Sequence, residues 1–492
     1  MKRIWLCFAA VSALIGGCVS VPKLRTPEVR PPPAYESPKP PADNLSSGAL
    51  DRWWTLYDDA QLDSLVDLAL ANSPGAKDAL SKLVQANAIR TETLDKLYIP
   101  QSTVSGTATE THTDLLSSSS SIPGFSFVVP GNTTSLSGDF GVTWELDLFG
   151  RRAAGRRAAN ADFYTAAFTY EATRTALIAS VAQSLLDARG LALQFEDAQK
   201  TSDIDKDLLR IVQVKFDHGL SPEGDVDQAV ANSESADAQT ESYRAQLTAA
   251  RRTLLVLVGK GFDPLQSLQA TPDVGTPPPV PASVPGELLR RRPDVRAAEW
   301  QITSAAGTLK VDELAVLPTL QLNPALTLSQ STGPFGATSA AWSIGANLTQ
   351  PILDRPRLVA VIHAQRAVAE QDVIAYEKAV QTAYGDTENA YMYLESDGRR
   401  VKMLQLAEQR AESAYDKARV GYARGFNDLT TTLTTEATWR SIRSQLSSAR
   451  ATLMDRSVQL FKALGGGWTP DQPAAGTPFA AKAVKANAEG VR

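Results

Sequence analysis

The sequence contains two copies of one pattern, and this duplication constrains the fold more than any other feature. Three landmarks recur at an offset of 206 residues: Tyr170-Glu171 as Tyr376-Glu377, Gly219 as Gly425, and Gly259 as Gly465. A proline-rich connector at residues 266–285 separates the copies. We therefore expect two equivalent repeats, residues 50–265 and 286–466, each with a helical segment, two strands and two long helices.

Each repeat contains segments in which apolar and polar residues alternate, as they do along strands with two different faces. Residues 135–148 place Phe140 and Trp144 on the apolar side and Asp139 and Glu145 on the polar side. The same reasoning predicts three further strands, at about residues 100–113, 319–328 and 342–352. The loops within the two pairs are expected at residues 114–134 and 330–340.

An apolar face opposite a polar face fits two settings, the core of a β-sandwich and the wall of a membrane barrel. Sandwich strands usually run about 5 or 6 residues, whereas a membrane strand needs about 9 to 11, so the length of these segments favours the membrane. Four strands do not close a barrel, for which about eight is the practical minimum. Other copies of the chain would have to supply the remaining strands.

The two longest helical segments lie at about residues 153–217 and 356–420. Glycine is sparse in both, and neither contains proline beyond Pro356. At about 1.5 Å per residue, a helix of about 65 residues extends roughly 95 Å, which predicts a coiled coil rather than a compact bundle. A soluble coiled-coil rod would explain the helices but would leave the strand pairs unexplained.

The N-terminus has the layout of a signal peptide. Residues 1–17 combine Lys2 and Arg3 with an apolar stretch of about 12 residues, too short for a spanning helix of about 20. The end of this leader, from Leu14 to Cys18, resembles a bacterial lipobox, so we expect Cys18 to be the lipidated first residue of the mature chain. The alternative is an ordinary secretory leader with Cys18 as an incidental thiol.

The residues after the leader predict a tethered outer-membrane lipoprotein. Val19 follows the cysteine, and bacterial lipoproteins that lack an acidic residue there are generally passed to the outer membrane. Residues 18–49 are rich in proline and are expected to form an extended arm, while residues 467–492 are expected to be a flexible tail. No later stretch is expected to be long and apolar enough for a transmembrane helix.

Composition excludes several classes of function. The 49 basic and 54 acidic side chains give a net charge of -5, which argues against nucleic acid as a partner. Both cysteines lie within the first 18 residues and the chain has only 3 histidines. Few side chains are therefore available for metal sites, cofactor binding or catalytic triads. We therefore expect no cofactor and no enzyme activity.

Several motifs resemble those of the TolC-like outer-membrane efflux proteins, specifically the lipoprotein channel subunits of resistance-nodulation-division (RND) pumps. The most specific is VPGELLRRRPDVRAAE, from Val284 to Glu299. The others are Trp53-Trp54 with Asp58 and Leu62, WELDLFG from Trp144 to Gly150, and ALGGGW from Ala463 to Trp468. The motifs occur in the family's order and cover nearly the whole mature chain.

The resemblance implies an α+β membrane protein that assembles as a homotrimer. Four strands from each chain would form a 12-stranded barrel in the outer-membrane lipid, continuous with a periplasmic barrel of long helices. By the same resemblance, the chain conducts drugs or other small molecules passively, and its partners are a periplasmic adaptor (membrane fusion) protein and an inner-membrane RND pump.

Each pair of long helices turns at a short segment, and by resemblance these two turns meet the adaptor. The expected contacts are Gly219, Leu220, Ser221, Asp225, Val226, Tyr422, Gly425, Asn427, Asp428 and Leu429. A purely structural role explains part of this set equally well. Gly219 and Gly425 suit the positive φ that ends a helix, and Ser221 or Asp428 suits the N-cap of the next one.

The sequence departs from the family near the second turn. A constricting aspartate of many relatives aligns with Thr434, and the leucine one helical turn before it aligns with Thr430. A hydroxyl does not hold a cation as a ring of carboxylates does. We therefore expect weaker cation binding, or a constriction formed instead by Asp225 or Asp428.

Two further alternatives follow from the sequence. The same fold serves as the outer-membrane duct of type I protein secretion, and a periplasmic adaptor also combines a lipid anchor with a coiled coil. The run from Arg290 to Arg292 suggests an anionic partner, but Pro293 and Asp294 begin a helix, so a salt-bridged lead-in is the preferred interpretation.

Overall fold

The computed structural model describes residues 24–36, 47–114, 131–280, 285–332 and 336–470. The predicted leader, the lipidation site Cys18 and most of the predicted tail therefore lie outside the described residues. The chain divides into two compact units. Of the described residues, the strand unit contains Ala86–Tyr164, Trp300–Ala375 and those up to Pro27, and the helix unit contains Glu28–Gln85, Thr165–Glu299 and those from Tyr376 onward.

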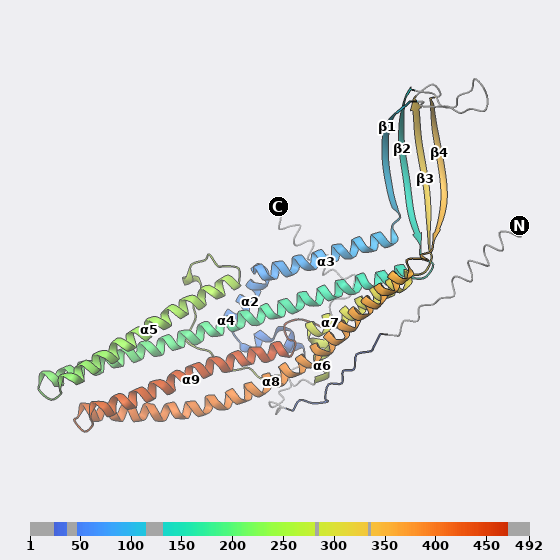
Figure 1. Cartoon of the computed structure of the whole chain (residues 1–492). Helices are drawn as coiled ribbons and strands as arrows, with labels where there is room; N and C mark the ends of the chain where they lie inside the picture. Colours follow the sequence, from blue (N-terminus) through green and yellow to red (C-terminus); the bar gives the residue numbers. More distant parts are fainter. Residues whose placement is uncertain (1–23, 37–46, 115–130, 281–284, 333–335, 471–492) are drawn as a thin grey trace, which may run out of the picture. The chain divides into compact units, whose positions relative to one another are not determined.

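The strand unit contains one antiparallel sheet with the order β1-β2-β3-β4 (Figure 1). Its strands are β1 (Gln101–Thr113), β2 (Gly131–Leu146), β3 (Thr319–Thr332) and β4 (Ala337–Thr349). All four predicted strands are confirmed, but the predicted loops were too long, because β2, β3 and β4 each extend into them. Threonine suits an exposed strand, so the polar composition of these segments did not end the strands.

The register of the sheet places apolar side chains in a row across all four strands. Val104 pairs with Phe140, Phe140 with Leu326, and Leu326 with Trp342. Val104 and Trp342 are 82% and 80% exposed. No second sheet covers this face among the described residues, so the sandwich alternative is wrong.

The opposite face of the sheet carries polar side chains. Asp139 lies between Ser105 and Thr327 in the register, and the Thr327 hydroxyl donates to its carboxylate at 2.7 Å. The sheet therefore has the two different faces that the alternation predicted.

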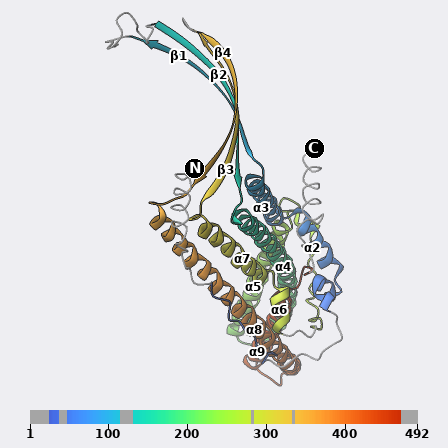
Figure 2. The same ribbon diagram turned by 90° about the vertical axis from the view of Figure 1, so that its right-hand side faces the viewer.

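Helices adjoin the strands within the strand unit. They are the ends of α3 (Pro74–Tyr98), α4 (Arg151–Asp217), α7 (Pro293–Leu314) and α8 (Arg355–Ala423). α3, α4 and α7 pack closely (Figure 2): a Cβ added at Gly155 would lie 3.1 Å from Leu97, and one at Gly307 would lie 2.9 Å from the Ala158 nitrogen. The two predicted long helices are confirmed as α4 and α8, and Pro356 lies in the first turn of α8 as expected.

The expectation that no stretch after the leader is long and apolar enough for a transmembrane helix was wrong for α4. α4 contains a stretch with a mean hydropathy of 1.3, which by length and composition would suit a membrane span. Within the structure, 56% of this stretch is buried, as in the core helix of a folded unit. Burial against neighbouring helices accounts for its apolar composition.

The helix unit contains the remaining helices. They are α2 (Ala60–Asn72), α5 (Glu223–Leu257), α6 (Pro285–Arg291), α9 (Leu429–Ala463) and the short 3₁₀ helices η1 (Ser47–Tyr57) and η2 (Leu265–Ser267). The main core of the helix unit contains residues of two motifs from opposite ends of the sequence, Trp53-Trp54 and ALGGGW. Trp53 stacks on Phe461 with ring centroids 5.3 Å apart, and the buried Trp468 indole donates to the Arg291 carbonyl at 2.7 Å.

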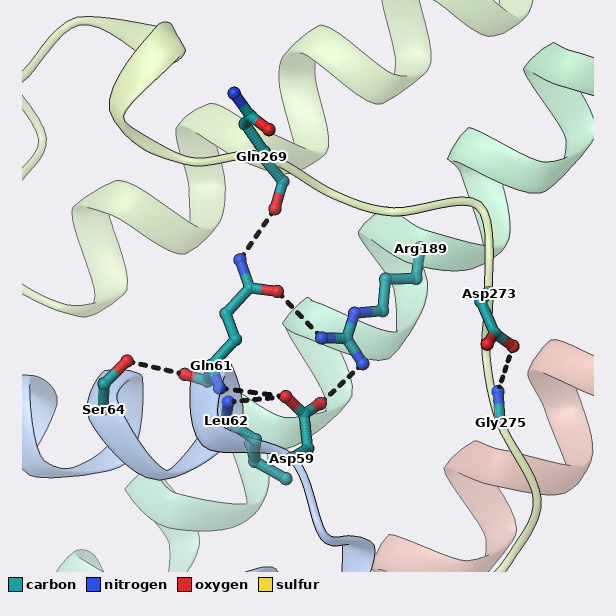
Figure 3. Close-up of polar contacts among 8 residues, drawn as sticks. All are labelled: Asp59, Gln61, Leu62, Ser64, Arg189, Gln269, Asp273 and Gly275. Atoms are coloured by element: carbon teal, nitrogen blue, oxygen red, sulfur yellow. Dashed lines mark hydrogen bonds and ion pairs between the residues drawn. The ribbon is translucent and has the colours of Figure 1, made fainter.

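A polar network holds the start of α2 against α4 and the connector (Figure 3). Asp59 accepts the backbone N–H groups of Gln61 and Leu62, which caps α2. Arg189 of α4 donates to Asp59 at 2.5 Å and to the side-chain oxygen of Gln61 at 2.8 Å, and the Gln61 amide donates to the Gln269 carbonyl at 2.7 Å. Burial alone would raise the pKa of Asp59, but Arg189 and these N–H groups hold it below its ordinary value.

Two arginines of the run are salt-bridged, as the preferred interpretation expected. Arg291 pairs with Asp51, and Arg292 pairs with Asp294 at 2.7 Å and with Asp386 at 3.1 Å. Pro293 begins α7. These ion pairs join α6 and the start of α7 to η1 and α8.

The described part of the proline-rich arm within the helix unit lies along α8. The Glu28 N–H donates to Glu377 at 2.9 Å, and the Tyr35 ring stacks on Tyr384 at 5.9 Å. Tyr35 is buried, so this arm is part of the packed structure of the helix unit.

Candidate functional site

The two helical hairpins of the helix unit turn at the same end of that unit (Figure 1). In the first hairpin, Gly219 has a φ of 71° and the Leu220 N–H donates to the Lys215 carbonyl at 2.8 Å. In the second, Gly425 has a φ of 81° and the Phe426 N–H donates to the Gly421 carbonyl at 2.8 Å. Both are Schellman turns, in which a glycine with positive φ ends the helix. The predicted role of the two glycines is confirmed.

The residue after each of these glycines is apolar and projects into solvent. Leu220 is 76% exposed and Phe426 is 81% exposed. They lie at equivalent positions of the two repeats, 206 residues apart. The pair therefore gives the hairpin end two apolar side chains that have little contact with the rest of the described structure.

Other predicted tip residues are buried between the two hairpins. Leu208 and Val212 of α4, Tyr422 at the end of α8 and Leu429 at the start of α9 form one apolar cluster, with Val226 partly buried against it. Tyr422 and Leu429 therefore hold the hairpins together and do not offer their side chains to solvent.

A cation also joins the two turns. The Lys215 ammonium lies 3.6 Å from the centre of the Tyr422 ring and donates to the Tyr422 carbonyl at 2.5 Å. The carbonyl belongs to the last turn of α8, where the helix dipole favours a positive charge. Burial raises the pKa of the Tyr422 hydroxyl.

The predicted N-cap at Ser221 is wrong. α5 begins after Pro222, which makes no side-chain cap, and the Ser221 hydroxyl instead donates to the Asp225 carboxylate at 2.6 Å. Proline occupies the N-cap position and its ring has no hydrogen-bond acceptor, so α5 starts without a side-chain cap. Asp225 is half-buried beside the turn and is engaged by this bond.

The predicted N-cap at Asp428 is confirmed. Its carboxylate accepts the Thr431 N–H at 2.7 Å, and hydrogen bonds from Thr431 lower the pKa of Asp428. The Asn427 amide donates to the Ala418 carbonyl at 3.3 Å and lies so close to Gly421 that an added Cβ there would be 2.4 Å from it. The second turn therefore depends on glycine at two places.

Thr430 and Thr434 lie on an exposed face at the start of α9. The Thr434 hydroxyl donates to the Thr430 carbonyl at 2.8 Å. This bond engages the Thr434 hydroxyl within the helix. Neither of the two positions carries a carboxylate.

A buried charged cluster lies deeper between the hairpins. Arg440 of α9 donates to Asp205 of α4 at 3.1 Å and to Glu436 at 3.2 Å. Glu436 is only 2% exposed, and burial together with the adjacent Asp205 raises its pKa to about 8. Tyr415 of α8 lies beside the pair and stacks on Trp439 at 5.4 Å.

Sequence reasoning missed three residues of this region: Lys215, Phe426 and Glu436. Phe426 could have been found, because the repeat offset relates it directly to the predicted contact Leu220. The partner of Lys215, Tyr422, and one neighbour of Glu436, Asp205, are contributed by the other hairpin, so neither contact is visible in the local sequence.

The sheet of the strand unit exposes an apolar face, and the paired hairpins of the helix unit expose an apolar end. The sequence profile of the family described as "Outer membrane efflux protein" matches residues 65–260 and 284–466. The chain belongs to this family.

Similar proteins span almost the whole chain. The pyoverdine export outer membrane protein OpmQ of Pseudomonas aeruginosa is 27% identical over 480 residues, which is 96% of this chain and 98% of the relative. The outer membrane protein OprJ of the same species is 27% identical over 460 residues, covering 89% and 92%.

Solved structures show the same fold. The outer-membrane channel OprN superposes with a TM-score of 0.80 and 25% identity, covering 92% of this chain and 100% of that one. The Campylobacter jejuni CmeC outer membrane channel superposes with a TM-score of 0.83 and 21% identity, covering 95% and 98%. The chain therefore has the TolC-like channel fold, and it is an outer-membrane efflux channel protein with a long periplasmic helical part. This family is one of channels rather than of enzymes.

Proposed function

We propose that three copies of the chain form a 12-stranded barrel in the outer membrane and that the barrel conducts small molecules passively to the exterior. The observation that supports this most directly is the exposed row from Val104 to Trp342 on a four-stranded sheet. Each edge strand, β1 and β4, has a ladder partner on one side only among the described residues. Closure with neighbouring copies satisfies both edges and turns the apolar face to lipid and the polar face to a water-filled lumen.

The helix unit would continue the conduit into the periplasm, with an RND pump of the inner membrane supplying energy and cargo through a periplasmic adaptor. The names of the relatives, among them a pyoverdine export protein and a toluene efflux pump component, support small molecules as cargo. A conduit of this kind breaks no bond, so we propose no enzyme activity and no cofactor for this chain. We also propose a lipid anchor at Cys18 after removal of residues 1–17.

The proposed adaptor contact is the exposed part of the hairpin end. Leu220 and Phe426 supply apolar area, and the polar side chains of Ser221, Asn427 and Asp428 lie around them in the two turns. Apolar anchors surrounded by polar residues are the usual composition of a contact between proteins. The proposed aperture at the same end is formed by Asp225, Asp428, Thr430 and Thr434.

Replacing the two apolar anchors tests this contact. Leu220→Glu together with Phe426→Glu should abolish drug efflux in cells and crosslinking of an adaptor to photoreactive residues placed at Ser221 and Asn427. Phe262→Glu is the matched control, because Phe262 is fully exposed but lies in the loop after α5, at the opposite end of that helix. Unchanged efflux and crosslinking in the double variant would refute the contact. Loss of protein export with unchanged drug accumulation on deletion of the gene would instead favour type I secretion.

A further inference from the structure

The strand unit contains a cavity of about 750 Å³ where the helices meet the sheet. Its walls come from α3, α4, α7 and the bases of three strands. A volume between about 300 and 1,000 Å³ is typical of sites that hold drug-sized molecules. The described tip residues take no part in it, so it is separate from the proposed adaptor contact and aperture.

Side chains from the polar face of the sheet line the cavity. Gln101 pairs with Thr143 and Glu145 pairs with Gln321 in the register, and all four line the cavity. Thr143 and Glu145 belong to the polar side of the alternation in β2, and Trp144 between them, on the apolar side, also lines the cavity. Under the proposed function, on which this inference rests, the polar face of the sheet is the wall of the lumen.

The inner wall of the cavity is apolar. Ile89 and Leu97 of α3 line it together with Ala158 of α4 and Val311 of α7. Gly155 also lines it, and its lack of a side chain lets Leu97 approach α4. Two of the α3 residues that line the cavity contact α4 of the same chain: Leu97 lies against Gly155, and Arg90 donates to Asn160 at 2.6 Å.

The charged groups of the lining favour an anion. Four basic side chains line the cavity, Arg90, Lys96, Arg151 and Arg152, against two acidic ones, Glu145 and Asp162.

Most of these positive charges are not neutralised by a carboxylate. Arg151 pairs with Glu145 at 3.6 Å, whereas the Arg152 guanidinium donates to the Glu145 backbone carbonyl. Among the described residues, Arg152 and Lys96 form no ion pair. Lys96 is exposed at the rim of the cavity, where its ammonium is available to a ligand.

We propose that this cavity binds amphipathic organic anions in the wall of the conduit. The ring system or aliphatic part of such a molecule lies against Leu97, Ala158 and Val311, and its anionic group lies near Lys96 and Arg152. Each subunit carries one such site, so a trimer offers three places where cargo of this class is held during passage.

The test uses two fluorescent probes that share one ring system. 8-Anilinonaphthalene-1-sulfonate carries a negative charge and N-phenyl-1-naphthylamine carries none. Binding of each is titrated to the trimer in nanodiscs, with empty nanodiscs as background, and the conductance of every variant is recorded in planar bilayers. The wild-type protein should bind the sulfonate at saturable sites, one per subunit.

Two variants separate the shape of the site from its charge. Thr93→Trp fills the cavity and should abolish binding of both probes, whereas Thr91→Trp should change neither. Both threonines lie on α3 and donate to the carbonyl four residues earlier, but only Thr93 lines the cavity. Lys96→Gln should weaken sulfonate binding about tenfold and leave the neutral probe unaffected, as expected for loss of one charged contact.

Three outcomes would contradict this proposal or the proposed function on which it rests. Equal sulfonate binding by Thr93→Trp and Thr91→Trp would refute the cavity as a site. Equal weakening of both probes by Lys96→Gln would refute anion recognition. A wild-type protein that does not conduct would refute the proposed function and with it the place of the cavity in a conduit wall, whereas conductance without Thr93-dependent binding would refute the cavity site alone.

Discussion

Gly259 and Gly465 lie 206 residues apart and make the same contact in the two repeats. Each follows the second long helix of its repeat and has a positive φ, 78° and 70°. A Cβ at Gly259 would lie 2.6 Å from the Asn72 carbonyl oxygen, and one at Gly465 would lie 2.7 Å from the Arg291 carbonyl oxygen. In both repeats, the end of the long hairpin therefore packs directly on the backbone at the end of a shorter helix.

This contact predicts unequal effects of alanine at two glycines that both have a positive φ, 70° at Gly465 and 81° at Gly425. Gly465→Ala should destabilise the protein by about 2–4 kcal/mol, because it combines a left-handed backbone with a steric clash. Gly425→Ala should cost only about 1 kcal/mol, because Gly425 also has a positive φ but has nothing within 4 Å of an added Cβ. Thermal unfolding of the purified variants measures the difference. Equal losses would show that the close approach to Arg291 contributes nothing.

Burial of Glu436 predicts a stability that depends on pH. Its folded pKa of about 8 lies above the ordinary value of 4.5, so between these values the folded protein binds more protons than the unfolded chain. The contribution of Glu436 to stability should therefore be full below pH 4.5 and be lost as the pH rises towards 8, where deprotonation places a second negative charge beside Asp205. Melting temperatures measured between pH 5 and pH 8.5 report this trend.

Glu436→Gln should remove most of that dependence, because glutamine keeps the shape of the neutral acid and has no proton to lose in this range. The exposed residue Glu412 provides the matched control, and Glu412→Gln should retain the wild-type slope. A wild-type melting temperature that rises from pH 5 to pH 8 would contradict the assignment of a protonated carboxyl to this site.

The hydroxyls at the proposed aperture predict weak cation selectivity. Thr434→Ala should leave the ratio of potassium to chloride permeability unchanged, and Thr434→Asp should raise it severalfold by creating a ring of carboxylates. Thr438→Asp, one helical turn further along α9, is the matched control and should have a smaller effect. Single-channel recording measures this permeability ratio. Strong cation selectivity that is abolished by Thr434→Ala but untouched by Asp225→Asn would contradict this account of the aperture.

Much of the fold could be predicted because its elements carry strong periodic signals. Alternation over residues 135–148 identified β2, and long stretches with few helix-breaking residues identified α4 and α8. The two turns were also predictable, because glycine adopts the positive φ of Gly219 and Gly425 without the steric cost that a side chain would bring. These signals are local in the sequence, so they can be recognised without knowing how the helices and strands pack.

The site was less predictable where its properties depend on contacts between distant segments. The structure of the first turn depends on Pro222, so the hydroxyl of Ser221 is free to bond Asp225 instead of the helix. The pKa of Glu436 depends on Asp205, which lies on another helix. The burial of Tyr422 and Leu429 likewise arises only when the two hairpins pack together.

The most direct test of the account is the mass of the folded complex extracted from the outer membrane, measured by native mass spectrometry in a mild detergent. We expect three copies of the chain, because neighbouring subunits pair the edges of β1 and β4 that lack a partner among the described residues. A stable folded species with the mass of one copy would contradict it.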